Sequence, residues 1–337
     1  MNFYEKMLSF QPIIFTRGRL HDQITLNQFP EWLQQLTKLF VYPEEYDEHN
    51  AKYGYMCQVI KCPDDVRGIA KRREYAAKYL NNNAIQWQLD DDLTFCKAKP
   101  DGQDGTWPFL KFTAMQDDTD WENLIDDIMT ACDSGFWVGG LGQRISPAGI
   151  ADFPFSVNSR VYTNTWFDFR KINPERFDWI GRAWKEDEFL PEDFHIQCQM
   201  VMKGIPVINM NKWASAGNKT QAAGGCATTR TLENHNKGMI RFADEWSNCT
   251  TLRWKDSWVK DKKKAALTIR LGKLYKQDKA TLLKHEDRLR VKLGGKPKAE
   301  AKELQKKANI LREELRESES RSRSYAEASH EIRKELV

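Results

Sequence analysis

The sequence predicts an α/β fold with a largely parallel sheet, and three observations support this prediction. Between residues 12 and 89, apolar runs and helical patterns follow the order strand, helix, strand, strand, helix, strand, which is typical of an α/β layer. Apolar residues make up 40% of the 337 residues, and the chain has 12 Trp, which is enough for a sizeable core. Two polar turns, TRGR and DDD, follow strands at the ends where such sheets bind ligands.

The first elements are a strand, a helix and two further strands. PIIFT, at residues 12–16, predicts a short buried strand, and RGR follows it as a turn. In NQFPEWLQQLTKLF (27–40), apolar residues recur at helical spacing after a proline. LFVY (39–42) and YMCQVIKCP (55–63) have the apolar and aromatic composition of strands.

The next helix and strand lead into an acidic triplet. DDVRGIAKRREYAAKYLNNN (64–83) predicts a helix, with acidic residues before it and asparagines after it. The strand AIQWQL (84–89) ends directly at Asp90, Asp91 and Asp92. Adjacent carboxylates repel one another, and hard cations such as Mg²⁺ or Mn²⁺ take oxygen ligands and bridge to phosphates. The triplet therefore indicates a metal site, and a plain surface turn is the alternative.

The middle of the chain mixes glycine-rich turns, aromatic strands and one amphipathic helix. GGLGQRISPAG is a turn region, RVYTNTWFDFRKI (160–172) predicts strands, and PEDFHIQCQMVMKG (191–204) predicts a helix. The second acidic cluster, MQDDTDW (115–121), precedes a helix that it caps. A competing metal site or an acceptor loop is the alternative for this cluster.

The composition changes near residue 255, which predicts two parts, 1–254 and 255–337. The second part has 24 Lys and Arg against 14 Asp and Glu, whereas the first has 28 against 34. Two helices, 262–293 and 297–320, joined by GGKP, are expected in this basic extension. A basic extension on an acidic body suggests a polyanion partner such as DNA, and a solvated tail is the alternative.

Several classes of protein are disfavoured by the sequence. No apolar run approaches the roughly 20 residues of a membrane span, so no membrane partner is expected. The N-terminus lacks the basic and apolar order of a signal peptide. Seven scattered cysteines without a CxxC pair indicate a reducing compartment, and we expect a cytoplasmic protein. The oligomeric state is left open.

Four motifs in order resemble those of GT-A glycosyltransferases. They are IIFTRGR, the helix RGIAKRREYAAKYL with Gly68 at its start, the DDD triplet, and the pair Glu192–Asp193 that opens a helix ending at Gly204. The resemblance covers roughly residues 10–215. It implies a GT-A fold, with a Rossmann-like mixed sheet and flanking helices, here followed by the basic helical extension.

A narrower resemblance is to the TET-associated glycosyltransferases of bacteriophages. GFWVGGLGQRISPAG, NTWFDFRKI and AGGCATTRTLENHNKGM carry it. That family is implicated in decorating hydroxymethylated pyrimidines in phage DNA with glucose or, in some relatives, arabinose. The resemblance implies a UDP-sugar donor and a DNA acceptor.

The resemblance also implies a role for individual residues. For the metal, Mn²⁺ or Mg²⁺, the main ligand would be Asp92, with Asp90 second and His235 as a candidate third ligand. Asp91 would contact the ribose or the sugar. The nucleotide and its diphosphate would be bound by residues of the first turn and of the long helix, which are Thr16, Arg17, Arg19, Gly68, Arg72 and Arg73. For Arg72 and Arg73 the alternative is that they face the acidic triplet itself.

Catalysis and acceptor binding are assigned in the same way. In inverting enzymes of this fold the carboxylate of the ED pair takes the proton of the acceptor hydroxyl, so Asp193 is the expected base and Glu192 the second choice. Helix capping is the structural alternative for both. The acceptor groove is expected at Arg144 and Arg160, which would meet phosphates, and at Trp166, which would stack on a base; a place in the core is the alternative for Trp166.

The sequence as a whole predicts a metal-dependent glycosyltransferase that transfers arabinose or glucose from a UDP-sugar to 5-hydroxymethylcytosine in phage DNA, with inversion. Three alternatives stay open. The acceptor is a glycan, a protein or a small molecule; or the chain is a DNA-binding protein with an inactive transferase core; or it is a nucleotidyltransferase, which also uses strand-end carboxylates with a metal.

Overall fold

The protein is described by a computed structural model. The described residues are 8–80, 83–100, 110–115, 117–143, 154–180, 191–217, 230–294, 297–300, 302–303, 306 and 310. Among them, no helix is of a length and apolarity that would carry it through a lipid bilayer.

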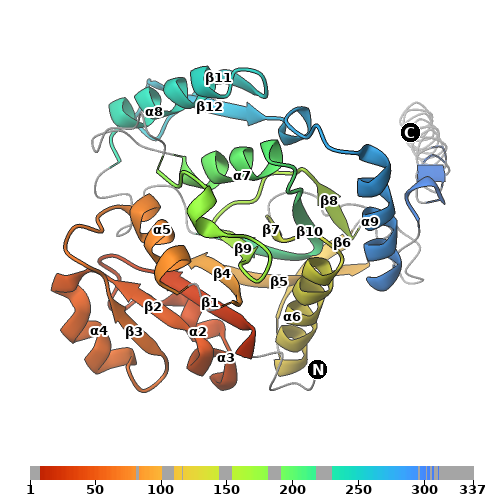
Figure 1. Cartoon of the computed structure of the whole chain (residues 1–337). Helices are drawn as coiled ribbons and strands as arrows, with labels where there is room; N and C mark the ends of the chain where they lie inside the picture. Colours follow the sequence, from red (N-terminus) through yellow and green to blue (C-terminus); the bar gives the residue numbers. More distant parts are fainter. Residues whose placement is uncertain are drawn as a thin grey trace, which may run out of the picture.

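One large mixed sheet forms the centre of the molecule (Figure 1). Its strand order is β3-β2-β1-β4-β9-β7-β10-β5-β6, and β8 pairs with β10. The strands run β1 Phe10–Phe15, β2 Lys38–Val41, β3 Gln58–Lys61, β4 Ile85–Asp90, β5 Thr94–Pro100, β6 Leu110–Ala114, β7 Val138–Gln143, β8 Phe155–Val157, β9 Asn164–Asp168 and β10 Val207–Ala216. The helices are α2 Ile24–Gln28, α3 Glu31–Leu36, α4 Tyr46–Tyr53, α5 Ile69–Tyr79, α6 Asp118–Asp133, α7 Glu192–Met202, α8 Leu232–Glu245 and α9 Lys279–Lys292, with 3₁₀ turns at Pro43–Glu45, Pro174–Arg176 and Leu271–Lys273.

The first four strands are parallel, as the sequence predicts. β1 lies between β2 and β4, and β3 pairs with β2, all in parallel register. Beyond β4 the sheet is mixed, because β9 runs antiparallel to β4 and to β7. Strand β10 is again parallel to β7, whereas β5 and β8 pair with it in antiparallel register. This mixed sheet with flanking helices confirms the predicted GT-A-like α/β fold.

The two faces of β1 explain why helices cover both sides of the sheet. Side chains alternate along a strand, so Ile13 and Phe15 point to one side and pack with Ala76 of α5. Phe10 and Ile14 point to the other side and join a core that α2, α3 and α6 complete. A further core lies between the sheet and helices α7 and α8.

The acidic cluster at 115–121 begins a helix, as predicted. Asp117 is the N-cap of α6, and its side chain accepts a hydrogen bond from the backbone N–H of Asp120 at 2.9 Å. Asp120 itself is buried and pairs with Lys97 at 2.5 Å. Among the described residues, these contacts show that the cluster is the capped start of a helix.

The basic extension begins differently from the prediction. Residues 263–269 form strand β12 (Lys263–Ile269), which pairs antiparallel with β11 (Thr250–Asp256), and the helix starts only at Lys279. The expected helix over 262–293 is therefore wrong in its first half. The reason is a two-residue period, since Ala265 and Ile269 are buried on one face of the strand with Leu267 between them.

The extension also shares its core with the body. The expected boundary between residues 254 and 255 falls inside β11. Leu271 packs with the residues around α7 and α8, and Leu282 and Leu289 of α9 pack in the core that α6 shares. Residues 298–300 are helical, and the rest of the second expected helix lies largely outside the described residues.

Close packing around β7 gives a testable consequence. A Cβ at Gly140 would lie 1.9 Å from Val161 Cγ1 and 2.6 Å from the backbone oxygen of Asn164. We expect Gly140→Ala to lower the free energy of unfolding by about 1 to 3 kcal/mol, because such overpacking forces the backbone to shift. Gly272→Ala is the matched control, since nothing lies within 4 Å of its added Cβ. Urea unfolding of both variants measures this, and equal midpoints would contradict it.

Candidate active site

The site lies where β1 and β4 end. In the parallel register of these strands, Phe15 is aligned with Asp90, so the turn after β1 and the acidic triplet after β4 are neighbours. Helix α2 fixes the triplet's backbone: the hydroxyl of Thr25 donates to the carbonyl of Asp90 at 2.6 Å, and its N–H donates to the carbonyl of Asp91 at 3.1 Å. Leu93 is fully buried and anchors the triplet on its far side.

Arg19 binds the last two aspartates of the triplet. Its Nη1 lies 2.5 Å from Asp91 Oδ1 and 2.8 Å from Asp92 Oδ2, and its side chain is largely buried. Gln23 holds the turn by donating to the Thr16 hydroxyl at 2.7 Å and to the Arg19 carbonyl at 2.9 Å. Burial raises the pKa of Asp91, and the Thr16 hydroxyl and the Arg19 charge oppose this rise. In this structure Arg19 therefore forms ion pairs with the carboxylates of the triplet.

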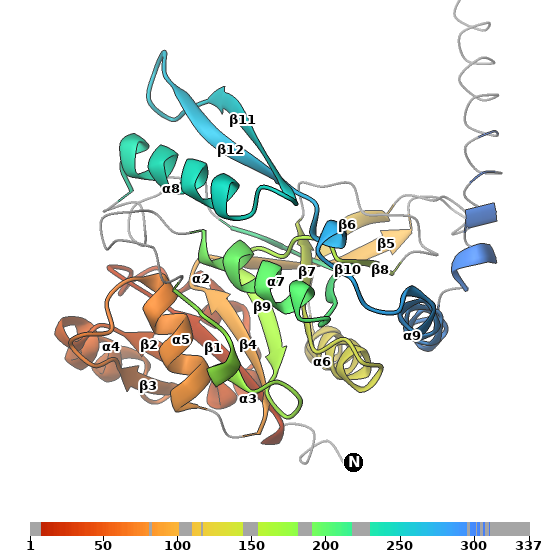
Figure 2. The same cartoon turned by 45° about the horizontal axis from the view of Figure 1, so that its top comes forward.

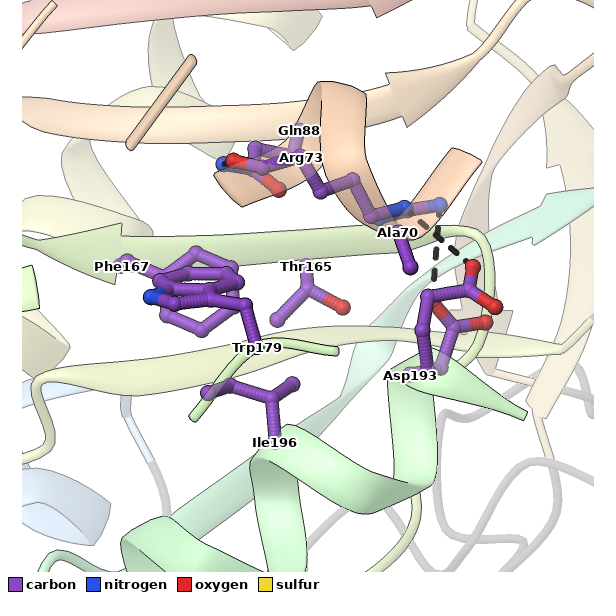
Figure 3. Close-up of a pocket in the computed structure, with 9 residues that line it drawn as sticks. Ala70, Arg73, Gln88, Thr165, Phe167, Trp179, Asp193 and Ile196 are labelled. Carbon is purple, nitrogen blue, oxygen red and sulfur yellow. Dashed lines mark hydrogen bonds and ion pairs between the residues drawn. The ribbon is translucent and has the colours of Figure 1, made fainter. Parts of the chain in front are cut away.

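Arg73 of α5 joins the triplet to the start of α7. Its Nη2 lies 2.9 Å from Asp90 Oδ1 and 3.4 Å from Asp193 Oδ1, and its Nε lies 3.4 Å from Glu192 Oε1. Figure 3 shows Arg73 pointing to Asp193. The two acidic motifs, about a hundred residues apart in the sequence, thus meet at one buried guanidinium. We call the five acids Asp90, Asp91, Asp92, Glu192 and Asp193 the carboxylate edge.

Negative charge is crowded at the carboxylate edge. Burial raises the pKa of Asp90 to about 7; Arg73 opposes the rise, and Asp193 and the other triplet carboxylates add to it. Burial raises the pKa of Glu192 to about 8, and the neighbouring Asp193 carboxylate adds to the rise. Glu192 therefore carries its proton for most of the time at pH 7 and is a poor base there. Of the ED pair, Asp193 is therefore the better candidate for a proton acceptor.

The carboxylate oxygens at this edge are the kind of ligand that a hard divalent cation binds. Five carboxyl groups surround two guanidinium groups, so negative charge is in excess, and carboxylate oxygen is the ligand that Mg²⁺ and Mn²⁺ prefer. Asp92 offers Oδ1, because Arg19 takes Oδ2. Within the described ranges, no three His, Cys, Asp or Glu side chains are already grouped as a metal site. The arginines hold the carboxylates in this structure.

Tyr42, at the end of β2, organises the cationic side of the site. Its ring centroid lies 4.5 Å from the guanidinium carbon of Arg72, 5.4 Å from that of Arg17 and 5.1 Å from that of Arg67. Its hydroxyl accepts a hydrogen bond from the N–H of Gly68 at 3.0 Å. The sequence predicted Tyr42 only as part of a strand and not as a site residue. The parallel order β2-β1-β4 was the signal that would have found it, because these strands end at one edge.

Gly68 and Arg72 shape the turns at this edge. Gly68 precedes α5 with φ of 85°, a left-handed value that glycine adopts without steric cost. Arg72 donates from Nη1 to the carbonyl of Thr16 at 2.6 Å, which ties α5 to the end of β1. The structure thus brings the residues that were predicted to bind the nucleotide of the sugar donor to one edge of the sheet. They are Thr16, Arg17, Arg19, Gly68, Arg72 and Arg73.

Thr163 connects the candidate base to the triplet. Its carbonyl accepts from the N–H of Asp90 at 3.0 Å, and its own N–H donates to Asp193 Oδ2 at 3.4 Å. Behind these groups lies a small cavity with Phe167, Trp179 and Ile196 on its apolar side and Arg73, Glu192 and Asp193 on its polar side (Figure 3). The backbone of Thr163 is in the left-handed region, with φ of 51°. No sequence motif indicated the role of this residue.

His235 is engaged elsewhere in this structure. It is buried on α8, where Nε2 lies 2.9 Å from the carbonyl oxygen of Ala265 and Nδ1 lies 2.9 Å from Nη2 of Arg230. Metal binding by His235, as the resemblance implies, would require one of these bonds to break. The geometry supports a structural role, fixing β12 to α8.

The buried imidazole predicts a pH dependence of stability. Burial and, secondarily, the Arg230 charge lower the pKa of His235 from 6.5 to about 4. The unfolded chain therefore binds this proton first, so the stability is complete above pH 6.5 and is lost as the pH falls toward 4. We expect the difference in unfolding free energy between the wild type and His235→Gln to shrink by about 2 kcal/mol from pH 7 to pH 5. A difference that stays constant in urea titrations at both pH values would refute this.

The predicted acceptor residues have mixed outcomes. Trp166 is fully buried in β9, where its ring lies 2.2 Å from the position of a Cβ at Gly139. It is a core residue, and the prediction that it stacks on a base is wrong. Arg160 is half-buried, with Nη1 donating to the carbonyl of Leu267 at 3.4 Å. Arg144 lies outside the described residues.

The fold and the site together define a class of protein. A sheet that carries an acidic triplet at the end of β4, facing an ED pair at the start of a helix, is the arrangement expected of a GT-A-like glycosyltransferase. No family model matches the chain. Two curated phage proteins do match it, each over 239 residues, 68% of this chain and 82% of the relative.

Both relatives are named Beta-glucosyl-HMC-alpha-glucosyl-transferase, where HMC denotes 5-hydroxymethylcytosine. The one from Enterobacteria phage T2 is 28% identical to this chain, and the one from Enterobacteria phage T6 is 27% identical. They confirm the predicted relationship: the chain is a homologue of phage HMC glycosyltransferases, and it is a glycosyltransferase.

Proposed function

We propose that the chain transfers glucose or arabinose from a UDP-sugar to 5-hydroxymethylcytosine in phage DNA, and that the transfer depends on a divalent metal. The observation that carries this proposal is the carboxylate edge, where Arg73 joins Asp90 to Glu192 and Asp193. The homology to phage HMC glucosyltransferases supports the DNA acceptor.

Each group at the edge has a proposed task. Asp90 and Asp92 would hold Mn²⁺ or Mg²⁺, which neutralises charge on the departing diphosphate when bound. The turn after β1, with Thr16 and Arg17, would bind the nucleotide, because guanidinium groups recognise phosphate and stack on planar rings. Asp91 would contact the ribose or the sugar, and Arg19 would hold Asp91 and Asp92 in place.

Asp193 is the proposed base for an in-line attack. Its Oδ2 is oriented by the Thr163 N–H, and its Oδ1 faces Arg73. From there it would accept the proton of the acceptor hydroxyl while that oxygen bonds to the anomeric carbon and the diphosphate leaves. This route inverts the anomeric centre, so an α-linked donor gives a β-linked product.

The names of the relatives favour a second acceptor. These names specify a β-glucosyl-HMC acceptor and an α-glucosyl product. By analogy, this chain would extend a sugar that HMC already carries. An α-linked product from an α-linked donor requires retention, and Asp193 would then not act as the base of a single in-line step.

One experiment separates these possibilities. The protein is incubated with Mn²⁺, each of several UDP-sugars, and duplex DNA carrying either bare HMC or β-glucosylated HMC, and the DNA is then digested to nucleosides. We expect a mass increase of one hexose or one pentose on one of the two nucleosides, and its loss in EDTA. NMR of the product reports the linkage. UDP-sugar hydrolysis without any mass increase would indicate a non-DNA acceptor, and no turnover at all would indicate an inactive core.

A further inference from the structure

A dense group of basic residues lies on the β11–β12 hairpin, outside the candidate active site. Between residues 253 and 264 there are six basic residues and two acidic ones. In Figure 2 the hairpin, with α8 alongside it, extends away from the large sheet. The hairpin forms a two-stranded sheet of its own.

The strand register sorts the hairpin side chains onto two faces. Residues that pair across an antiparallel ladder share a face, and successive pairs alternate. The pairs Leu252–Leu267 and Thr250–Ile269 lie on the face whose core includes Phe242 of α8. The pairs Arg253–Ala266 and Lys255–Lys264 lie on the opposite face. We call Arg253, Lys255 and Lys264 the basic hairpin face.

Internal ion pairs do not neutralise the basic hairpin face. Lys263, on the other face, pairs with Asp256. Arg253 and Lys255 are exposed, and no carboxylate among the described residues lies within ion-pair distance of either. Lys264 lies over the ring of Trp258, with Nζ at 5.3 Å from its centroid. Ala266 and Thr268 share this face and have small side chains, so the longer basic side chains extend beyond them.

The hairpin is anchored close to the candidate base. Arg160 donates to the carbonyl of Leu267 in β12 at 3.4 Å, and Thr163 donates to Asp193 at 3.4 Å. Three residue steps separate Arg160 from Thr163, and an extended chain spans at most about 11 Å over that length. A long polyanion lying on the hairpin is therefore within reach of the carboxylate edge.

We infer that the basic hairpin face binds the phosphate backbone of duplex DNA and delivers the acceptor strand to the active site. This inference rests on the proposed function, because it takes DNA to be the acceptor. Three cations on a narrow two-stranded ribbon match a backbone that carries one phosphate charge per strand about every 3.4 Å. Phosphate contacts of this kind position the duplex and carry no sequence preference.

The test compares duplex binding by two charge-matched triple variants. In Arg253→Gln/Lys255→Gln/Lys264→Gln the hairpin face loses its charge. In Lys284→Gln/Arg288→Gln/Lys292→Gln, α9 loses the same charge from exposed positions. Fluorescence anisotropy with HMC-containing duplex, between about 50 and 200 mM salt, gives the slope of log affinity against log salt.

We expect the hairpin variant to lose about 2.7 from this slope and about 500-fold in affinity at 0.1 M salt, since each phosphate contact contributes about 0.9. The α9 variant should keep the wild-type slope. The double variant Arg253→Gln/Lys255→Gln spares the Lys264–Trp258 contact and should lose about 1.8. Unchanged UDP-sugar hydrolysis in all three would show that the fold and the donor site are intact.

Three results would overturn the inference. If the wild type glycosylates HMC DNA and the hairpin variants keep its salt slope, the hairpin does not bind DNA, although the proposed function stands. If the α9 variant loses as much slope as the hairpin variant, the DNA contact is not specific to the hairpin. If the wild type neither binds nor modifies the duplex, the proposed function fails and the inference fails with it.

Discussion

Replacing Arg73 by methionine is expected to lower the free energy of unfolding by about 3 to 5 kcal/mol, since removal of one partner leaves buried charge uncompensated. Arg73 is the cation that Asp90, Glu192 and Asp193 share, and its side chain is only 6% exposed. Such a loss is a large part of the total stability of a typical domain. Guanidinium chloride unfolding at pH 7 measures it.

The loss should depend on pH with a defined sign. Without Arg73, the pKa values of Asp90 and Glu192 rise further above their unfolded values, so the folded variant binds protons more readily than the unfolded chain. Its stability is then lost as the pH rises and is regained as the pH falls. The deficit of Arg73→Met should therefore shrink between pH 8 and pH 5.5.

The matched control is Arg67→Met. Arg67 also pairs with carboxylates, Glu44 at 2.6 Å and Asp64 at 3.9 Å, but its side chain is 46% exposed. Exposed pairs contribute less than about 1 kcal/mol. Equal effects of the two substitutions, or a deficit of Arg73→Met that grows in acid, would contradict the view that Arg73 holds the carboxylate edge together.

Asp92→Asn is expected to reduce sugar transfer by a factor on the order of 10³, with a small effect on stability, because it removes charge where the diphosphate would be neutralised. The amide keeps the size and shape of the carboxylate. Measured kcat/KM for the UDP-sugar, together with a melting curve, separates the catalytic effect from unfolding.

Asp65→Asn is the control for this variant. Asp65 is an exposed acid in the pair that precedes α5. It carries the same carboxylate group as Asp92 but lies outside the carboxylate edge. We expect its activity to stay within about twofold of the wild type, as for most surface substitutions. If Asp92→Asn retained wild-type activity, the triplet would be a surface turn of no catalytic importance.

The acidic motifs and the first four strands were predictable because local patterns determine them. Apolar runs set β1 to β4, and parallel strands with ends in register place TRGR beside DDD. The ED pair was identified through the family resemblance. A place for Arg73 at the triplet was one of the two predicted alternatives, but its contact with the ED pair was not predictable, since that depends on how α5 packs against the sheet.

Other features depend on contacts that no local pattern encodes. Trp166 belongs to a strand of mixed aromatic and polar residues, and only the place of this strand between β4 and β7 in the sheet shows that the residue is buried. The β11–β12 hairpin has the composition of a basic helix, and its alternating Ala265, Leu267 and Ile269 are outweighed by lysines in the sequence. Tyr42 and Thr163 act through backbone and ring contacts, which leave no motif.

The central claim is that the acidic triplet holds a cation that binds the diphosphate of a sugar donor. A crystal structure with UDP and Mn²⁺, with anomalous data at the manganese edge, tests it most directly. The account predicts a manganese peak bound to Asp92 and Asp90, between the triplet and the two phosphates, with Asp193 facing the donor position. A nucleotide bound away from β4, with Arg19 and Arg73 still occupying all the acids, would contradict it.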